Sequence, residues 1–281
     1  MKSNNSGVII NADDFGITSG VNRAIFELVD AGVLTSTSVM SNMPDFEEIL
    51  NLKNRIGIGM HFNLTVGRPV TEPQKVRSLI NEEGNFPGLS QLIQRIKQRR
   101  ISPQETEIEL DAQIRRLADT GINPDHINSH ESLIKYPFFS AIIRRLALKC
   151  GIRAVRTYTP RKFDYHRLLS PRKILISIYL EFQKAIWKAN GFTMADRYDS
   201  LIEPELNYEK AFHKLKDIFQ SLRPGVLEIG VHPGYCDEGE EFLGEYIFER
   251  EIELKSLMSP EFRDVVKHSN VKMITFKEIG N

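Results

Sequence analysis

Residues 7–16 read Gly-Val-Ile-Ile-Asn-Ala-Asp-Asp-Phe-Gly, an apolar run that leads directly into two adjacent carboxylates. The run predicts a buried strand, and the glycine after it predicts a turn into a helix. Buried carboxylates are costly unless they are paired, hydrogen-bonded or bound to a cation. In parallel α/β folds, ligands bind at the carboxyl ends of strands. Asp13 and Asp14 are therefore candidates for metal binding and acid–base chemistry, and the alternative is a turn with a helix N-cap.

Beyond this stretch, segments with strand character alternate with segments of helical periodicity. The segments 20–31, 103–120, 137–150 and 208–222 place apolar residues on one helical face. Strands separated by helices of ten or more residues are typical of parallel βαβ units. With the first strand we count seven or eight strand candidates, the others being 35–40, 56–64, 125–130, 153–156, 226–232 and 271–276.

That number of strands is enough to close a barrel, and no change in composition marks a domain boundary. We therefore predict an α/β fold, a TIM-like (β/α) barrel with about seven strands, formed by residues 1–281 as a single domain. Two insertions are expected. One is the turn-rich segment near 65–88, and the other lies near 160–200, outside the repeating pattern.

Composition excludes several classes of protein. The chain of 281 residues is 41% hydrophobic and 26% charged, which argues against disorder. Lys plus Arg equals Asp plus Glu, 37 each, so no net charge attracts nucleic acid or a membrane. The two cysteines, Cys150 and Cys236, form no disulfide framework and fit a reducing compartment. With no secretory signal and no apolar run that spans a bilayer, we expect a cytoplasmic protein.

Polar side chains recur near the carboxyl ends of four predicted strands. Residues two or four apart in a strand share a face, so each set can point to one side of the sheet. Barrel enzymes build their active sites there from several strands. We take Asn63 and Glu228 as candidates for binding or orienting the substrate. The sets are Asn11 and Asp13; His61 and Asn63; His126, Asn128 and His130; Glu228 and His232.

One carboxylate and two histidines from separate strands match a common ligand set for a divalent ion. We select Asp14, His61 and His130, because three protein ligands leave positions open for water and substrate. A bound metal lowers the pKa of its water and polarises a carbonyl oxygen. Asp13 is near enough to take a proton from that water, and His232 could protonate a leaving amine.

This arrangement requires an irregular backbone at the end of the first strand. Adjacent strand residues point to opposite faces, so Asp13 and Asp14 can share a site only if the chain twists there. Gly16 makes such a twist feasible. His126 is interpreted as a supporting or structural residue, because nothing requires it in the metal sphere. A lone histidine is more often a surface or core residue than a ligand. The functional assignment of His61 and of His232 therefore depends on the other residues of the set.

Six motifs together resemble the YdjC-like carbohydrate deacetylases, which include chitooligosaccharide and hopanoid-biosynthesis-associated deacetylases. The resemblance extends from residue 8 to about residue 275, with little of it in 160–200. Each motif is weak alone, but their order along the chain is specific. The motifs are Asn11-Ala12-Asp13-Asp14-Phe15-Gly16, Gly20-Val21-Asn22, Leu34-Thr35-Ser36-Thr37-Ser38, Gly59-Met60-His61-Phe62-Asn63-Leu64, Asn128-Ser129-His130 and His232-Pro233-Gly234-Tyr235.

The resemblance implies a polysaccharide-deacetylase-like (β/α) barrel that binds one divalent ion, magnesium or zinc. The implied reaction hydrolyses the N-acetyl group of an amino sugar or N-acetylated oligosaccharide. By position, Asp13 is the general base and His232 the acid, and Arg156 orients Asp13. The metal ligands are again Asp14, His61 and His130. The resemblance is also compatible with a homodimer.

The chain departs from the family pattern in two places. The family commonly has Asp where this chain has Asn128, and a histidine-rich stretch where this chain has Glu131-Ser132-Leu133-Ile134-Lys135. These changes leave the metal ligands in place but affect contacts around them. Two alternatives therefore stay open: a non-catalytic sugar-binding relative, and a metal-dependent hydrolase of another bond such as a phosphoester. The second is ranked lower, because such sites usually have more cationic groups or a second metal.

Overall fold

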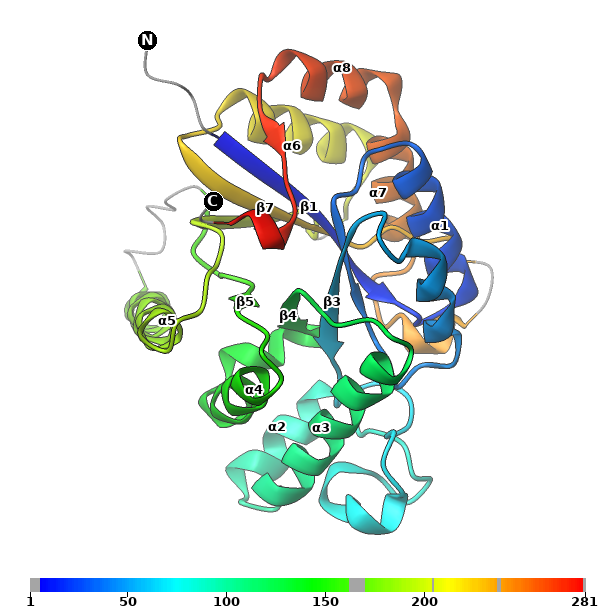
Figure 1. Ribbon diagram of the computed structural model, residues 1–281, viewed down its shortest axis with the longest axis vertical. Helices are drawn as coiled ribbons and strands as arrows, with labels where there is room; N and C mark the ends of the chain where they lie inside the picture. The colour runs from blue at the N-terminus through cyan, green and yellow to red at the C-terminus, as the bar shows by residue number, and fades with distance from the viewer. Residues whose placement is uncertain (1–5, 162–169, 204, 237–238, 280–281) are drawn as a thin grey trace.

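A single parallel sheet forms the centre of the computed structural model, which describes residues 6–161, 170–203, 205–236 and 239–279 (Figure 1). Its strands run in the order β5-β4-β3-β2-β1-β7-β6, and β8 pairs with the start of β1. All the pairings are parallel. The strands are β1 (Ser6–Phe15), β2 (Ser36–Val39), β3 (Gly57–Phe62), β4 (His126–Ser129), β5 (Ala154–Val155), β6 (Arg197–Ser200), β7 (Gly225–Val231) and β8 (Lys272–Met273).

The sheet is curled into a half-barrel, consistent with the TIM-like barrel expected from the sequence. Its two end strands are β5 and β6. Two isolated parallel bridges, Ala154 to Thr193 and Pro160 to Tyr198, connect the segments at these ends. Because the paired strands are parallel, their carboxyl ends lie at the same edge of the sheet, where the polar residues were predicted to meet.

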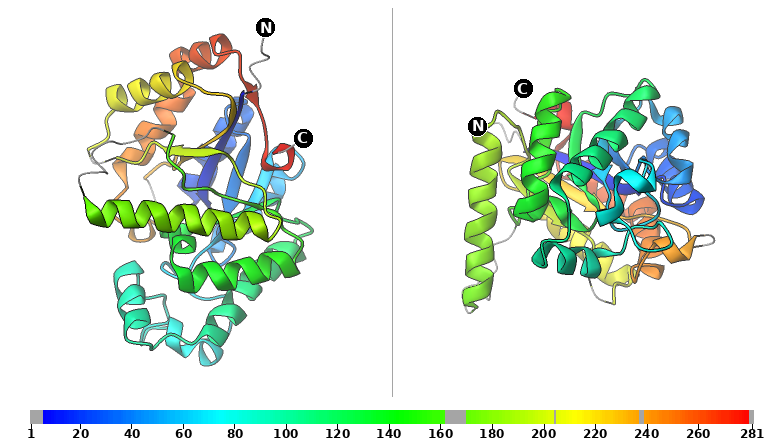
Figure 2. Two further views of the ribbon diagram at one scale, coloured as in Figure 1. Left: turned by 90° about the vertical axis from the view of Figure 1, so that its left-hand side faces the viewer. Right: turned by 90° about the horizontal axis from the view of Figure 1, so that it is seen from below.

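Helices pack around the outside of the sheet. α1, α6, α7 and α8 gather near β1 and β7, and α3 and α4 pack against each other near β3 and β4 (Figure 1). α5 runs across the side where β5 and β6 end the sheet (Figure 2). The helices are α1 (Ser19–Asp30), α2 (Leu89–Lys97), α3 (Pro103–Asp119), α4 (Pro137–Lys149), α5 (Pro171–Ala189), α6 (Tyr208–Gln220), α7 (Phe248–Met258) and α8 (Pro260–His268), with 3₁₀ segments η1 (Pro44–Leu52) and η4 (His130–Lys135).

α1 shows how local sequence produces an element here. Its apolar residues at helical spacing, including Val21, Ile25 and Leu28, are fully buried. The N-cap is Thr18, whose hydroxyl accepts a hydrogen bond from the Val21 amide at 3.1 Å. Ser19 is the first helical residue. Gly32 follows the helix with φ +69°, the left-handed conformation that glycine adopts at helix ends.

The structure corrects several expected elements. β6 belongs to the central sheet, so the interpretation of 160–200 as lying outside the alternating pattern is wrong at its end. Residues 162–169 of that segment lie outside the described residues. The segment 65–88 contains only short 3₁₀ turns, as expected for a turn-rich insertion. The helix α2 that follows it was not predicted. The last strand, expected over 271–276, is reduced to β8.

The apolar core lies between the sheet and its helices. Every residue of β1 is buried, as the opening apolar run predicts. Burial on both faces is typical of strands in parallel sheets.

Within the described part of the chain, none of the helices has the length and apolar character that a membrane crossing requires.

Candidate functional site

The end of β1 bends so that its two aspartates serve one site. Asp14 has φ +68°, a left-handed conformation that is uncommon outside glycine, and the β1–β2 register shifts between Ala12 and Phe15. The twist that the sequence required is therefore present, and it begins at Asp14 itself. Gly16 continues it with φ +95°, and its amide donates to the Asn22 side chain at 2.6 Å.

Asp14, His61 and His130 converge as the sequence predicted. His61 lies near the end of β3, and His130 begins η4 directly after β4. Asp14 Oδ1 lies 2.9 Å from His130 Nδ1 and 3.2 Å from His61 Nε2. One ligand atom from each residue lies within 4.8 Å of the others, close enough for a single ion. Two imidazole nitrogens and one carboxylate oxygen are suitable donors for a divalent ion.

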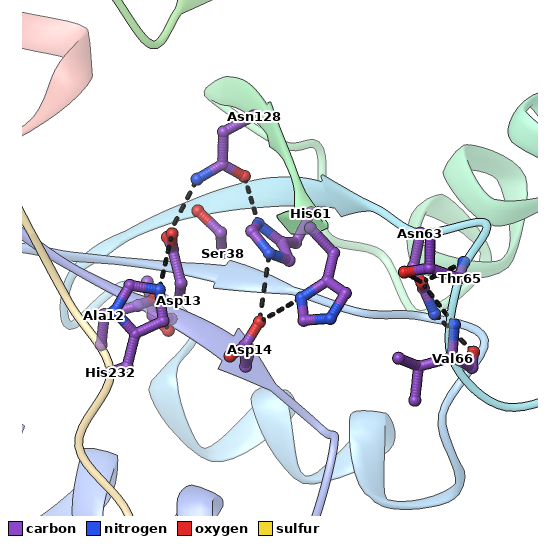
Figure 3. Close-up of polar contacts among 12 residues, drawn as sticks. Ala12, Asp13, Asp14, Ser38, His61, Asn63, Thr65, Val66, Asn128 and His232 are labelled. Atoms are coloured by element: carbon purple, nitrogen blue, oxygen red, sulfur yellow. Dashed lines mark hydrogen bonds and ion pairs between the residues drawn. The ribbon is translucent and has the colours of Figure 1, made fainter. Parts of the chain in front are cut away.

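Asn128 supports this group from β4. Its Oδ1 lies 2.6 Å from His61 Nδ1, and its Nδ2 donates to Asp13 Oδ1 at 3.0 Å (Figure 3). Since the carbonyl oxygen can only accept, His61 Nδ1 donates to it, and Nε2 is the ring nitrogen that lies next to Asp14. Metal-binding histidines are commonly fixed in this way by their second nitrogen. The residues present therefore fit a bound divalent ion.

Asp13 is held by a buried arginine. Arg156, just after β5, donates to Oδ2 at 2.5 Å and to Oδ1 at 2.8 Å. Asn11 donates to Oδ1 as well, at 2.7 Å. Burial would raise the pKa of Asp13, but the Arg156 charge and hydrogen bonds outweigh burial and hold it well below its usual value. Asp13 is therefore ionised at neutral pH.

Glu228 and Asn63, the other two expected orienting residues, lie in different surroundings. Glu228 on β7 is fully buried and accepts from Arg156 Nε at 2.5 Å, so it contacts Asp13 only through that arginine. Asn63 is also fully buried; its amide bonds to Thr65 and Val66 within its own loop (Figure 3) and donates to Asn42 Oδ1 at 3.1 Å. Asn63 thus shapes a loop at the site, while Glu228 fixes Arg156.

His232 follows β7 and lies on the other side of Asp13. Its Nε2 is 3.6 Å from Asp13 Oδ2 (Figure 3). Burial lowers the pKa of His232 to about 4, although Asp13 and Asp14 act in the opposite direction. The imidazole is therefore neutral at neutral pH. Its Nδ1 has no hydrogen-bond partner among the described residues.

His126 has the supporting position that the sequence suggested. Its ring stacks on Phe276 with centroids 3.8 Å apart, and its Nδ1 lies 2.6 Å from Asp125 Oδ1. Its Nε2 lies 3.0 Å from the Ser38 hydroxyl, which also accepts from Asn11. A buried hydrogen-bond chain thus runs from Asp125 to Asn11 and so to Asp13.

A cleft of about 670 Å³ opens onto these groups. This volume is in the range of sites that bind small ligands. Both aspartates, the three candidate histidines and Arg156 line it, together with parts of the loops after β3, β4 and β7. The candidate ion site and the candidate proton-transfer groups therefore face one space that a substrate could enter.

Three polar residues at this site, of which Arg250 and Glu253 are buried, were missed by the sequence reasoning. Arg250 and Glu253 lie on α7, and Tyr246 lies just before it. Arg250 donates to Asp14 Oδ2 at 2.8 Å. Glu253 accepts from the His232 backbone amide at 2.7 Å and from the Tyr246 hydroxyl at 2.7 Å. In sequence, Arg250 and Glu253 belong to a charged helix and carry no signal that separates them from solvent-exposed charges.

Comparison with known proteins decides the family. The sequence profile described as "YdjC-like protein" matches residues 7–268. The chain belongs to this family.

The YdjC-like chain is 32% identical to a protein named carbohydrate deacetylase from Geobacillus stearothermophilus, over 96% of each chain. It is 30% identical to a protein of the same name from Brevibacillus brevis, over 97% of this chain and 99% of the relative. A solved structure from Enterococcus faecalis V583 matches with a TM-score of 0.77 at 24% identity, over 97% of this chain and 98% of the other. The last comparison supports the fold of the YdjC-like chain.

Proposed function

We propose that this YdjC-like protein is a metal-dependent hydrolase that removes the N-acetyl group from an amino sugar or N-acetylated oligosaccharide. The observation that carries the proposal is the Asp14–His61–His130 group beside Asp13 and His232 in one cleft. The names of relatives at about 30% identity over nearly the whole chain support the same reaction. The proposal takes residues 1–281 as one polysaccharide-deacetylase-like domain that carries the activity.

The proposed cofactor is one divalent ion, zinc or magnesium. Asp14, His61 and His130 would hold it, and when bound it supplies a water of lowered pKa and a Lewis acid for the amide carbonyl. Imidazole ligands suit zinc better than magnesium, which prefers oxygen ligands. Zinc is therefore the first ion to test.

Asp13 is the proposed general base, and Arg156 keeps it ionised and oriented. Because His232 is neutral at neutral pH, it can act as an acid only after it receives a proton. Its Nε2 lies 3.6 Å from Asp13 Oδ2, so a small movement brings the two within hydrogen-bond distance. The proton taken from water by Asp13 can thus pass to His232 and on to the leaving nitrogen, and the products are acetate and a free amine.

Replacing Asp13 with Asn tests this assignment. We expect Asp13→Asn to abolish acetate release from N-acetylated sugars, because an amide cannot accept the proton, while Zn²⁺ binding to the apo-protein persists. Acetate release and calorimetric titration with Zn²⁺ measure the two effects. Asp30→Asn, at an exposed aspartate paired with Arg55, is the matched control and should leave both unchanged.

Two results would contradict the proposal. Normal turnover by Asp13→Asn would remove Asp13 from the role of base. If the wild-type protein binds Zn²⁺ but releases no acetate from a panel of N-acetylated glycans, it is instead a non-catalytic sugar-binding relative.

A further inference from the structure

The two adjacent aspartates are each held by a different buried arginine. Arg156 binds Asp13 and comes from the chain after β5. Arg250 binds Asp14 and comes from α7, which packs against α1, α6 and α8. Both arginine side chains are 3% exposed. Arg156 was predicted from the sequence and Arg250 was not.

The two carboxylate oxygens of Asp14 have different neighbours. Arg250 Nη2 occupies Oδ2 at 2.8 Å, while Oδ1 alone lies next to His61 and His130, at 3.2 and 2.9 Å. Arg250 is itself fixed, because its Nε donates to the Tyr246 carbonyl at 3.0 Å. The left-handed backbone at Asp14 also needs surrounding contacts to hold it in place.

We propose that Arg250 is a positioning residue for the metal site, which holds Asp14 so that only one of its carboxylate oxygens is offered to the ion. The inference rests on the metal centre of the proposed function. It concerns how that centre selects and holds its ion, and does not depend on which bond is hydrolysed.

A single carboxylate oxygen and two imidazoles make a compact ligand set. Such a set suits Zn²⁺, which prefers four ligands in a tetrahedral arrangement with an open position for water. A carboxylate free to use both oxygens suits larger ions that accept more oxygen ligands, such as Mn²⁺. Arg250 therefore favours Zn²⁺ over Mn²⁺, even though its positive charge acts against both ions.

The test replaces each arginine by methionine, which has similar length and no charge. In Arg250→Met we expect the apo-protein to bind Zn²⁺ ten- to a hundred-fold more weakly, the usual effect of losing a partner of a metal ligand. Binding of Mn²⁺ should change less, so the ratio of the two affinities falls. Arg156→Met should leave both affinities within about threefold and reduce acetate release instead. Calorimetric titration of the apo-proteins gives the affinities.

The ratio of the Zn²⁺ and Mn²⁺ affinities distinguishes a specific effect on the metal site from a folding defect, because partial unfolding weakens the binding of both ions equally. Arg250→Lys, which keeps the charge and one donor, should recover part of the Zn²⁺ affinity. Arg145→Met, at an exposed arginine paired with Glu107, is the control for the substitution and should change nothing.

Unchanged Zn²⁺ binding in Arg250→Met overturns the inference, as does an equal loss of Zn²⁺ and Mn²⁺. It also fails if the wild-type protein binds neither ion. The proposed function fails separately: a protein with the expected change of ion preference but without acetate release keeps the inference and loses the deacetylase assignment.

Discussion

At the scale of single residues, Asn128 connects the two halves of the site. One atom of its amide accepts from the imidazole of His61, a candidate metal ligand, and the other donates to the carboxylate of Asp13. A neutral amide can do both at once, whereas an ionised carboxylate at this position would face Asp13 with a like charge. The departure from the family's usual Asp is therefore compatible with an intact site in this chain.

Replacing Asn128 with Leu should weaken metal binding and folding together. His61 and Asp13 would each lose a buried partner, which costs about 1–3 kcal/mol of unfolding free energy and about tenfold in Zn²⁺ affinity. Urea denaturation and calorimetric titration measure the two effects. Asn51→Leu, at an exposed asparagine of η1, is the control. A variant with wild-type stability and affinity would show that the contacts of Asn128 are energetically neutral.

At the scale of elements, α7 links Asp14, a candidate metal ligand, to the loop that carries His232. Arg250 contacts Asp14, and Glu253, one helical turn later, accepts from the His232 amide. Glu253 is fully buried, and burial raises its pKa to about 7, although its two hydrogen-bond donors oppose that rise. The folded protein therefore holds this carboxyl group protonated at pH values where the unfolded chain has lost the proton.

This shift gives a dependence of stability on pH with a defined sign. Between pH 4.5 and about 7 the folded state binds more protons at Glu253 than the unfolded state does. The contribution of Glu253 to the free energy of unfolding therefore falls as pH rises and is lost above pH 7. Glu253→Gln mimics the protonated form. We expect it to raise the free energy of unfolding by about 1–3 kcal/mol at pH 8.5 and to change it little at pH 4.5.

Urea denaturation at the two pH values checks this prediction. Glu251→Gln, on the same helix and paired with Lys255 at the surface, is the control and should show no such difference. An equal effect of Glu253→Gln at both pH values would contradict a raised pKa and would indicate an effect of the hydrogen bonds alone.

The elements also show where sequence reasoning succeeds. β1 and α1 were predictable because an apolar run and a helical stripe are local signals. β6 was not, because Arg-Tyr-Asp-Ser is polar and its side chains are only half buried. The convergence of the three candidate metal ligands was predictable because each lies at or just beyond the end of a strand. Arg250 was not, because its role depends on the packing of α7 against β1, a contact between residues 236 positions apart.

At the scale of the whole molecule, the side between β5 and β6 is the least regular part of the sheet. Two isolated bridges connect these ends, and α5 lies across them (Figure 2). Arg161 adds polar contacts there: it donates to Asp199 on β6 and to Asp217 on α6, each at 2.7 Å. The single tryptophan, Trp187, is buried on α5 against Phe192 and therefore reports on this side of the molecule.

Replacing Arg161 with Met should loosen this side before the rest of the fold. The arginine is mostly buried but its partners are partly exposed. We therefore expect the free energy of unfolding to fall by about 1–2 kcal/mol, less than when a fully buried pair is broken. Because few strand contacts cross this side, the urea midpoint from Trp187 fluorescence should fall more than the midpoint from far-UV circular dichroism. Arg145→Met is again the control. Equal shifts of both midpoints would show that the β5–β6 side unfolds together with the remainder of the sheet.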